Sequence, residues 1–198
     1  MINILLVGVG GQGTVLAAKV LAQAAQNKGW QVRTAETIGM AQRGGSVTSH
    51  VRMGSCGEAV HAPLVAPGTA DVIIAFEPGE AARALPYLAT DGVIVTASTP
   101  VQPVTAALSA QAYRASEMLE AVEAELHDRP AQLHVIDDAA VLARVGNRRA
   151  LNTVLLASAV ACGAVPLTID ELKDAIAACV KPRFVEMNIA AVDAALQA

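Results

Sequence analysis

A glycine-rich loop between an apolar run and an alanine-rich stretch constrains the fold of this chain more than any other feature. Residues Ile2–Val7 form a continuous apolar run typical of a buried strand, and Gly13–Lys28 has the periodicity of an amphipathic helix. Between them, Gly8, Gly10 and Gly13 match the pattern G-x-G-x-x-G, which lets backbone amides approach a phosphate at a helix N-terminus. Alternatively, these glycines only permit a tight turn and close packing of helix on strand. Both interpretations predict a strand–turn–helix unit that opens an α/β fold.

Strands and helices are expected to alternate along the rest of the chain. The patterns predict strands at 30–36, 46–53, 71–76, 93–97 and 132–137, and helices at 79–89, 115–126, 138–145, 150–162, 169–179 and after Pro182. Residues 53–60 (MGSCGEAV) look like a hairpin turn. No internal repeat or low-complexity linker divides the chain. The sequence therefore predicts a single domain over 1–198 with a Rossmann-like layered α/β fold, in which helices flank a mostly parallel sheet and the C-terminal segment is helical.

Composition and charge exclude several classes of partner. The net charge is −4 and no basic run is present, so the chain lacks the electrostatic footprint of a nucleic-acid-binding protein. The longest apolar run, Val154–Val165, is shorter than the ~18 residues that a membrane span requires. The first residues lack the cationic segment and cleavage site of a signal peptide. We therefore expect a cytoplasmic protein that binds neither nucleic acid nor membrane.

The cysteines and histidines predict no metal site. Cys56, Cys162 and Cys179 have no C-x-x-C spacing, and the four histidines form no H-x-x-x-H pair. We expect the cysteines to be buried thiols in a reducing compartment.

The glycine loop also raises the alternative of an NAD(P)-dependent oxidoreductase. A dinucleotide site needs an acidic residue about 20 residues further on, at the end of the second strand, and Glu36 occupies that place. However, the chain has no second domain and no pair of residues spaced to transfer a proton during hydride chemistry. A non-catalytic binding or scaffold protein of the same fold is a third possibility.

Two long motifs carry a resemblance to a known family. The stretch GVGGQGTVLAAKVLA, followed by ETIGMAQRGGSVTSHVR, resembles the gamma-type subunit of 2-oxoacid:ferredoxin oxidoreductases, and MAQRGGS is most similar to the indolepyruvate oxidoreductase beta subunit. The resemblance continues through ADVIIAFEPGEAARALPYL, GNRRALNTVLLASAVA and KPRFVEMNIAAVDAAL, and so covers nearly the whole chain.

The resemblance implies one subunit of an enzyme complex. Such a complex oxidatively decarboxylates an arylpyruvate, passes electrons to ferredoxin and releases an acyl-coenzyme A. Thiamine diphosphate, magnesium and 4Fe-4S clusters are then expected on a larger catalytic subunit, with coenzyme A as co-substrate at or near this chain and no tightly bound cofactor of its own. We expect a homodimer in isolation and a hetero-oligomer with the catalytic subunit.

The predicted binding residues fall in two loops. Backbone amides of the glycine loop are expected to donate to phosphate, although the Gln12 side chain can instead brace the turn. Arg43 is expected to bind a carboxylate or phosphate, since the flanking glycines leave room for its planar guanidinium group. Met40 is assigned to a subunit contact or an aryl substrate. The complete predicted set is Gly8, Gly10, Gly11, Gln12, Gly13, Arg43, Gly44 and Gly45.

Other polar residues are weaker candidates. Asp137 and Asp138 precede a predicted helix and suit an N-cap. His50 and Arg52 share one face of a predicted strand, which is either solvent-exposed or a wall of the active site. Asn152 matches a family position, with a hydrogen-bond network as the alternative role. The pair Glu77-Pro78 ends a strand at the edge where α/β sheets bind ligands, and a plain turn explains it equally well.

Overall fold

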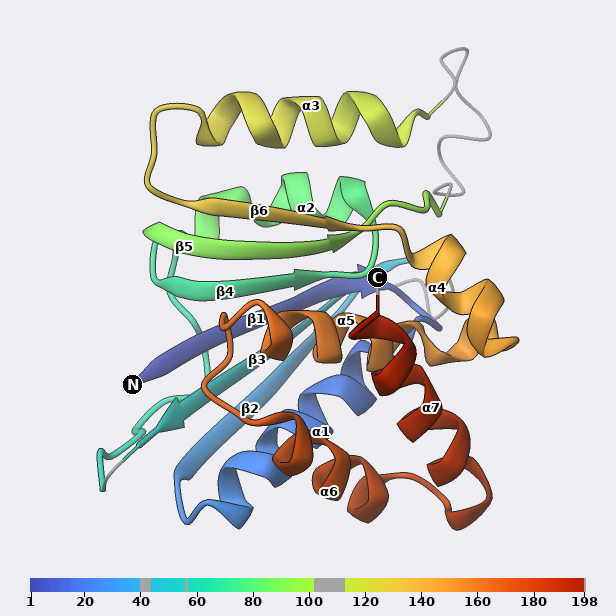
Figure 1. Ribbon diagram of the computed structural model, residues 1–198. Coiled ribbons are helices and arrows are strands. Elements are labelled where there is room, and N and C mark those ends of the chain that lie inside the picture. Colours follow the sequence, from blue (N-terminus) through green and yellow to red (C-terminus); the bar gives the residue numbers. More distant parts are fainter. Residues whose placement is uncertain (40–43, 56, 102–112, 198) are drawn as a thin grey trace.

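The computed structural model describes residues 1–39, 44–55, 57–101 and 113–197, which build a six-stranded sheet between two helical layers (Figure 1). The strands follow the spatial order β2-β3-β1-β4-β5-β6. Neighbours from β1 to β6 pair in parallel, whereas β3 runs antiparallel to both β1 and β2. Their bounds are β1 Ile2–Val9, β2 Gln31–Ile38, β3 Ser46–Gly54, β4 Ala70–Ala75, β5 Leu88–Ala97 and β6 Gln132–Ile136. The predicted α/β class is confirmed, with β3 as the strand that opposes the others.

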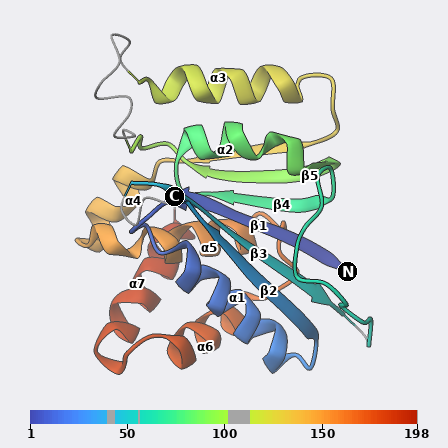
Figure 2. The ribbon, with the colours of Figure 1, turned by 180° about the vertical axis from the view of Figure 1, so that it is seen from behind.

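The helices cover the two faces of the sheet unequally. Figures 1 and 2 show α2 (Pro78–Ala84) and α3 (Ala115–Leu126) over one face. The other face carries α1 (Thr14–Asn27), α5 (Leu151–Ala161), α6 (Ile169–Cys179) and α7 (Val185–Ala195), and α4 (Asp138–Val145) joins this layer at the strand ends. Short 3-10 turns are η1 (Leu85–Tyr87), η3 (Arg148–Ala150) and η4 (Pro182–Phe184).

Alternate residues of the central strand supply two separate cores. Ile4 and Leu6 of β1 pack in the cluster under α1 and the C-terminal helices, while Leu5 and Val7 face the cluster under α2 and α3. This is the period-two alternation of a strand that is buried on both faces. The apolar run at the start of the sequence therefore reflects a central strand between two helical layers.

Local capping signals fix the C-terminal helices at the predicted bounds. Asp137 accepts a hydrogen bond from the Ala140 amide (3.0 Å), which confirms the predicted N-cap of α4. Thr168 and Glu171 form a reciprocal capping box at the start of α6. Helices α4 and α6 accordingly begin and end where the sequence pattern places them, and α3 does so without a side-chain cap.

Three local expectations are wrong. Among the described residues, β3 pairs with β1 and β2 and not with the strand that follows it, so the hairpin expected at 53–60 is not found and the antiparallel hairpin joins β2 to β3 instead. The helix expected at 79–89 ends at Ala84, since Pro86 has no amide hydrogen to donate to the carbonyl four residues earlier, and a 3-10 turn then leads into β5. Cys162 is exposed and Cys179 is only partly buried, whereas the sequence predicts both thiols to be buried. Cys56 lies outside the described residues.

Within the part of the chain that the structure describes, no helix has the length and apolar character needed to cross a membrane.

Candidate functional site

The glycine loop lies at the carboxyl ends of β1 and β4, where the chain leaves the sheet toward opposite faces. After β1 the chain enters α1 on one face, and after β4 it enters α2 on the other (Figure 1). Such a switch point opens a crevice at the strand ends, and ligands of open α/β sheets bind there. The fold therefore places the predicted loop at the edge where a binding site is expected.

Gln12 braces this switch point from inside the loop. Its Oε1 accepts a hydrogen bond from the Val9 amide (2.7 Å), and its Nε2 donates to the Phe76 carbonyl (2.8 Å). Gly8 has a packing role, because a Cβ at this position would lie 2.9 Å from Gln12 Oε1, Phe76 Cβ and Thr14 Cγ2. These two residues hold the loop in shape.

Part of the predicted phosphate-binding backbone is engaged within the protein. The Gly10 amide donates to the Gly45 carbonyl (2.9 Å), and the Gln12 amide donates to the Val9 carbonyl (3.1 Å). Gly11 and Gly13 adopt positive φ angles of 104° and 89°, a conformation that other residues rarely adopt. The loop geometry thus depends on glycine at both positions, while two of the four predicted donor amides already have partners.

The bond between Gly10 and Gly45 brings the two predicted loops together. Gly44 and Gly45 close the loop between β2 and β3, and Gly45 lies next to Ser46, which pairs with Val9. The sequence motifs around residues 10 and 45 are therefore neighbours in space. Met40 and Arg43 lie outside the described residues.

A network of buried polar side chains surrounds the start of α2, and sequence reasoning missed most of it. Glu77, 2% exposed, caps the helix by accepting from the Glu80 amide (3.1 Å). The Tyr113 hydroxyl donates to Glu77 and accepts from the Gly79 amide (2.9 Å). The pKa of Tyr113 lies above its usual range, because burial and the adjacent Glu77 carboxylate disfavour the phenolate. Only the Glu-Pro pair at a strand end signalled this N-cap in the sequence.

Glu80 extends this network to the β2–β3 hairpin. Its carboxylate, 3% exposed, accepts a hydrogen bond from Ser46 Oγ (2.5 Å) and forms an ion pair with Arg83. Glu80 thereby links α2 to the residue that follows the Gly44-Gly45 pair. The hairpin end is thus fixed both to the glycine loop and to α2.

Asp138 provides a second buried carboxylate anchor at the strand ends. Its Oδ1 accepts hydrogen bonds from the Ser98 amide (3.0 Å), the Ser98 hydroxyl (3.2 Å) and the Thr99 amide (2.9 Å). Asp138 therefore ties the end of β5 to the start of α4, and its role is structural.

The structure separates His50 and Arg52 from the glycine loop. Arg52 pairs with Asn3 near the start of β1, whereas the loop follows the other end of that strand. His50 is 5% exposed, and its Nδ1 accepts a hydrogen bond from the Val65 amide (3.1 Å). Burial lowers the pKa of His50 below 6.5. Both side chains hold the segment that follows β3, since Arg52 donates to the Ala62 carbonyl (2.9 Å) and His50 accepts from the Val65 amide. An active-site wall on this strand face stays a prediction.

Strand order argues against a dinucleotide site of the usual kind. Glu36 lies exposed on the edge strand β2, and β3 separates that strand from β1. In a dinucleotide-binding fold the acidic residue ends the strand next to β1 and so reaches the ribose. The insertion of β3 removes that proximity.

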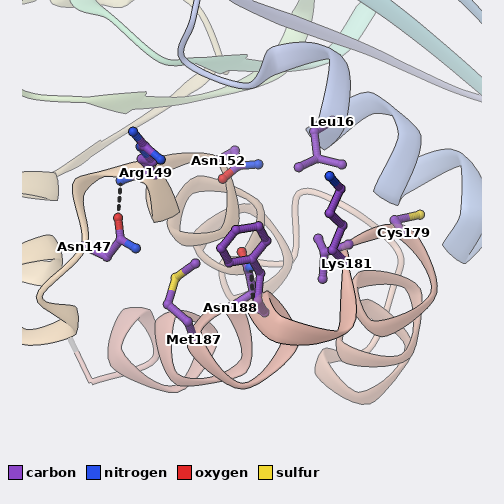
Figure 3. Close-up of a pocket in the computed structure, with 10 residues that line it drawn as sticks. Leu16, Asn147, Arg149, Asn152, Cys179, Lys181, Met187 and Asn188 are labelled. Atoms are coloured by element: carbon purple, nitrogen blue, oxygen red, sulfur yellow. Dashed lines mark hydrogen bonds between the residues drawn. The ribbon is translucent and has the colours of Figure 1, made fainter.

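A cavity of about 350 Å³ lies between α1 and the C-terminal helices, close to the end of the glycine loop (Figure 3 shows its lining residues). Asn152 connects the two features, because a Cβ on Gly13 would lie 3.3 Å from Asn152 Nδ2. Asn152 is 6% exposed, and its Oδ1 has no hydrogen-bond partner among the described residues. The cavity is lined by Leu16, Asn147, Arg149, Asn152, Cys179, Val180, Lys181, Phe184, Met187 and Asn188. Residues from six separate elements and the connections between them meet here, so no local sequence pattern identifies this cavity.

Across residues 1–39, 44–55, 57–101 and 113–197, no group of three or more His, Cys, Asp or Glu side chains is arranged to hold a metal ion.

Solved structures with the same fold define the structural class. The chain superposes on the gamma subunit of a keto/oxoacid ferredoxin oxidoreductase from Geobacter sulfurreducens with a TM-score of 0.70 and 22% identity, covering 100% of this chain and 97% of that one. It also matches 2-oxoglutarate:ferredoxin oxidoreductase from Magnetococcus marinus, solved with 2-oxoglutarate, coenzyme A and succinyl-CoA bound. That match has a TM-score of 0.71 and 17% identity, and covers 99% of this chain but 31% of the larger one. The fold is thus the one used by gamma subunits of this class.

Sequence comparison identifies the family. Residues 3–198 match the family described as pyruvate ferredoxin/flavodoxin oxidoreductase, and the chain belongs to this family. The indolepyruvate oxidoreductase subunit IorB of Pyrococcus horikoshii is 36% identical, covering 99% of this chain and 95% of that protein. The IorB subunit of Thermococcus kodakarensis is 34% identical over the same shares. The resemblance found in the sequence motifs is confirmed.

Proposed function

We propose that this chain is the coenzyme A-side subunit of an indolepyruvate or arylpyruvate:ferredoxin oxidoreductase. The complex converts a 2-oxoacid, coenzyme A and oxidised ferredoxin into an acyl-coenzyme A, carbon dioxide and reduced ferredoxin. The full-length similarity to two IorB subunits supports this assignment. A larger catalytic subunit supplies thiamine diphosphate, magnesium and the 4Fe-4S clusters in this proposal, and the chain acts in a cytoplasmic hetero-oligomer.

The observation that carries the site assignment is the backbone bond from Gly10 to the Gly45 carbonyl (2.9 Å). It joins the glycine loop to the end of the segment that contains Arg43. In the proposal, the amides of Gly11 and Gly13 and the Arg43 guanidinium group bind the phosphates of coenzyme A, because both kinds of group are donors suited to an anion. The relative from Magnetococcus marinus, solved with coenzyme A bound, has the same fold over this region.

Substitution of Arg43 in the assembled complex tests this site. Arg43→Ala should lower acyl-coenzyme A formation about ten- to hundredfold, since a charge-assisted hydrogen bond contributes about 1.5–3 kcal/mol. Decarboxylation on the larger subunit should keep its rate, because Arg43 is assigned to the later half-reaction. Single-turnover assays that record carbon dioxide release and thioester formation separately provide the measurement.

The matched control is Arg33→Ala. Arg33 lies exposed on β2, in the same hairpin, and its described side-chain bond is a 3.4 Å contact to the adjacent Val32 carbonyl. Arg83 is unsuitable as a control, because it forms an ion pair with the buried Glu80. If Arg43→Ala and Arg33→Ala both leave the two steps at wild-type rates, the loop does not serve coenzyme A.

We have two expectations for the isolated chain: it forms a homodimer, and it has no oxidoreductase activity. With the larger subunit it forms a hetero-oligomer. A monomer at high concentration in sedimentation experiments would contradict the first expectation. Oxidoreductase activity of the purified chain alone would contradict the second.

A further inference from the structure

The cavity between α1, α5, α6 and α7 has the size of a small-molecule site. Its volume of about 350 Å³ lies within the range of roughly 300–1,000 Å³ that is typical of ligand pockets. Figure 3 shows Asn147 and Arg149 on one side of it and Lys181 and Cys179 on the other. Its lining shares none of its residues with the glycine loop or the Gly44-Gly45 pair.

The charged groups at this cavity are cationic. Arg149 and Lys181 line it, and neither forms an ion pair with any described residue. No aspartate or glutamate belongs to the lining. Both cationic side chains are exposed, so their charges lie at the mouth and can reach an incoming ligand. An anionic group on the ligand is the complement of this arrangement.

The remaining wall is apolar and includes an aromatic ring. Leu16, Val180, Phe184 and Met187 contribute it, and Phe184 is 39% exposed, which is unusual for such a large apolar side chain. The guanidinium carbon of Arg183 lies 4.7 Å from the centre of the Phe184 ring. A planar ring on the ligand can pack against Phe184 and Met187.

Asn152 is the polar group in this wall that the fold leaves unsatisfied. The neighbouring Asn188 uses both ends of its amide, since Oδ1 accepts from Thr153 Oγ1 (2.5 Å) and Nδ2 donates to the Phe184 carbonyl (2.7 Å). Asn147 accepts from the Arg149 amide (3.0 Å). In contrast, Oδ1 of the buried Asn152 has no partner among the described residues, which costs free energy unless a ligand supplies one. Rotation of the amide can present either its oxygen or its nitrogen.

We propose that this cavity binds a small aromatic anion. The acid group of the ligand pairs with Arg149 and Lys181, its ring packs against Phe184, and a ring or exocyclic polar atom forms a hydrogen bond with the Asn152 amide. Indole carboxylates and phosphorylated adenosines share this chemistry. The proposal uses different residues from the glycine loop, so it can fail or succeed independently of the coenzyme A assignment.

Calorimetric titration of the full-length chain tests the proposal. The two probes are indoleacetate and ADP, with inorganic phosphate as the anion without a ring and indole as the ring without an anion. One or both aromatic anions should bind with one site per chain and at least tenfold more tightly than phosphate or indole. Preference for indoleacetate would assign the site to aryl acids, and preference for ADP to adenine nucleotides.

Three substitutions locate the binding to this cavity. Asn152→Leu, Lys181→Ala and Phe184→Ala should each weaken binding of the aromatic anion about tenfold. Arg33→Ala is the matched control, because Arg33 is a cation exposed on the edge strand β2 and does not line the cavity. Circular dichroism of each variant checks that the fold is retained, and Lys181 and Phe184 lie at the surface, where truncation leaves the core intact.

Two outcomes would overturn the proposal. In one, neither aromatic anion binds more tightly than phosphate or indole, or the three variants bind as the wild type does. In the other, titration of the assembled complex shows that the larger subunit abolishes binding, in which case this face is a subunit interface rather than a ligand site.

Discussion

Replacement of Gln12 by alanine should destabilise the chain through the ends of β1 and β4. The side chain accepts from the Val9 amide (2.7 Å) and donates to the Phe76 carbonyl (2.8 Å), and alanine removes both bonds. A hydrogen bond contributes about 1 kcal/mol net, and a buried group left without a partner costs about 1–3 kcal/mol. We therefore expect the free energy of unfolding to fall by about 2–4 kcal/mol, and Tm by roughly 5–15 °C for a chain of this length.

Urea and thermal unfolding followed by circular dichroism provide the measurement. Gln23→Ala is the matched control, because Gln23 bonds only to Asn27 (2.9 Å) on the exposed side of α1 among the described contacts. That bond joins residues four apart on a helix surface, so its loss should cost at most about 0.5 kcal/mol. The bracing argument is refuted if Gln12→Ala is as stable as Gln23→Ala. Reduced thioester formation in such a stable variant would assign Gln12 to the ligand instead.

Three further substitutions test other parts of the structure. Gly13→Ala (φ 89°) should be less stable than Gly29→Ala (φ 74°). Both substitutions carry about 1–2 kcal/mol of backbone strain, but only the new Cβ at residue 13 would lie close to another side chain, that of Asn152. Equal urea midpoints of the two variants would contradict this. His50 must be neutral to accept its hydrogen bond, and the folded state lowers its pKa from 6.5. The free energy of unfolding should therefore keep its full value above about pH 6.5 and decrease as the pH falls below it. His50→Gln should flatten this dependence in urea unfolding between about pH 5 and 7.5. Asp138→Ala should cost about 2–4 kcal/mol, because the Ser98 hydroxyl and the Thr99 amide lose their acceptor while the Ser98 amide keeps the Ile136 carbonyl, and a Tm equal to that of the wild type would exclude the anchoring role.

The helices could be predicted from the sequence because their ends depend on nearby residues. The Asp137 N-cap and the Thr168–Glu171 capping box act within one turn, so the pattern alone places α4 and α6. The position of β3 could not be predicted in this way. β3 lies between β1 and β2 because it pairs with both of them, and β1 is separated from it in the sequence by α1 and β2. No local sequence signal encodes that choice of partner.

The same distinction applies to the candidate site. The glycine loop was found because its residues are consecutive and their spacing has a physical meaning. Tyr113 and Glu77 lie 36 positions apart, and Asn152 reaches Gly13 only after the C-terminal helices have packed under α1. Such contacts join segments that the sequence keeps far apart, so only the folded chain reveals them.

The packing of α1 against the C-terminal helices has a consequence for synthesis of the chain. Leu21 and Ala24 of α1 are fully buried in the cluster that α5 and α6 complete, and Lys28 forms an ion pair with Glu171 (2.6 Å). At about 5–20 residues per second, a ribosome needs on the order of ten seconds to proceed from Asn27 to Leu151. During that interval α1 can pack on β1, β2 and β3, but the side that contacts α5 and α6 has no partner yet. The cluster on this face of the sheet is therefore complete only after the last helices have been synthesised.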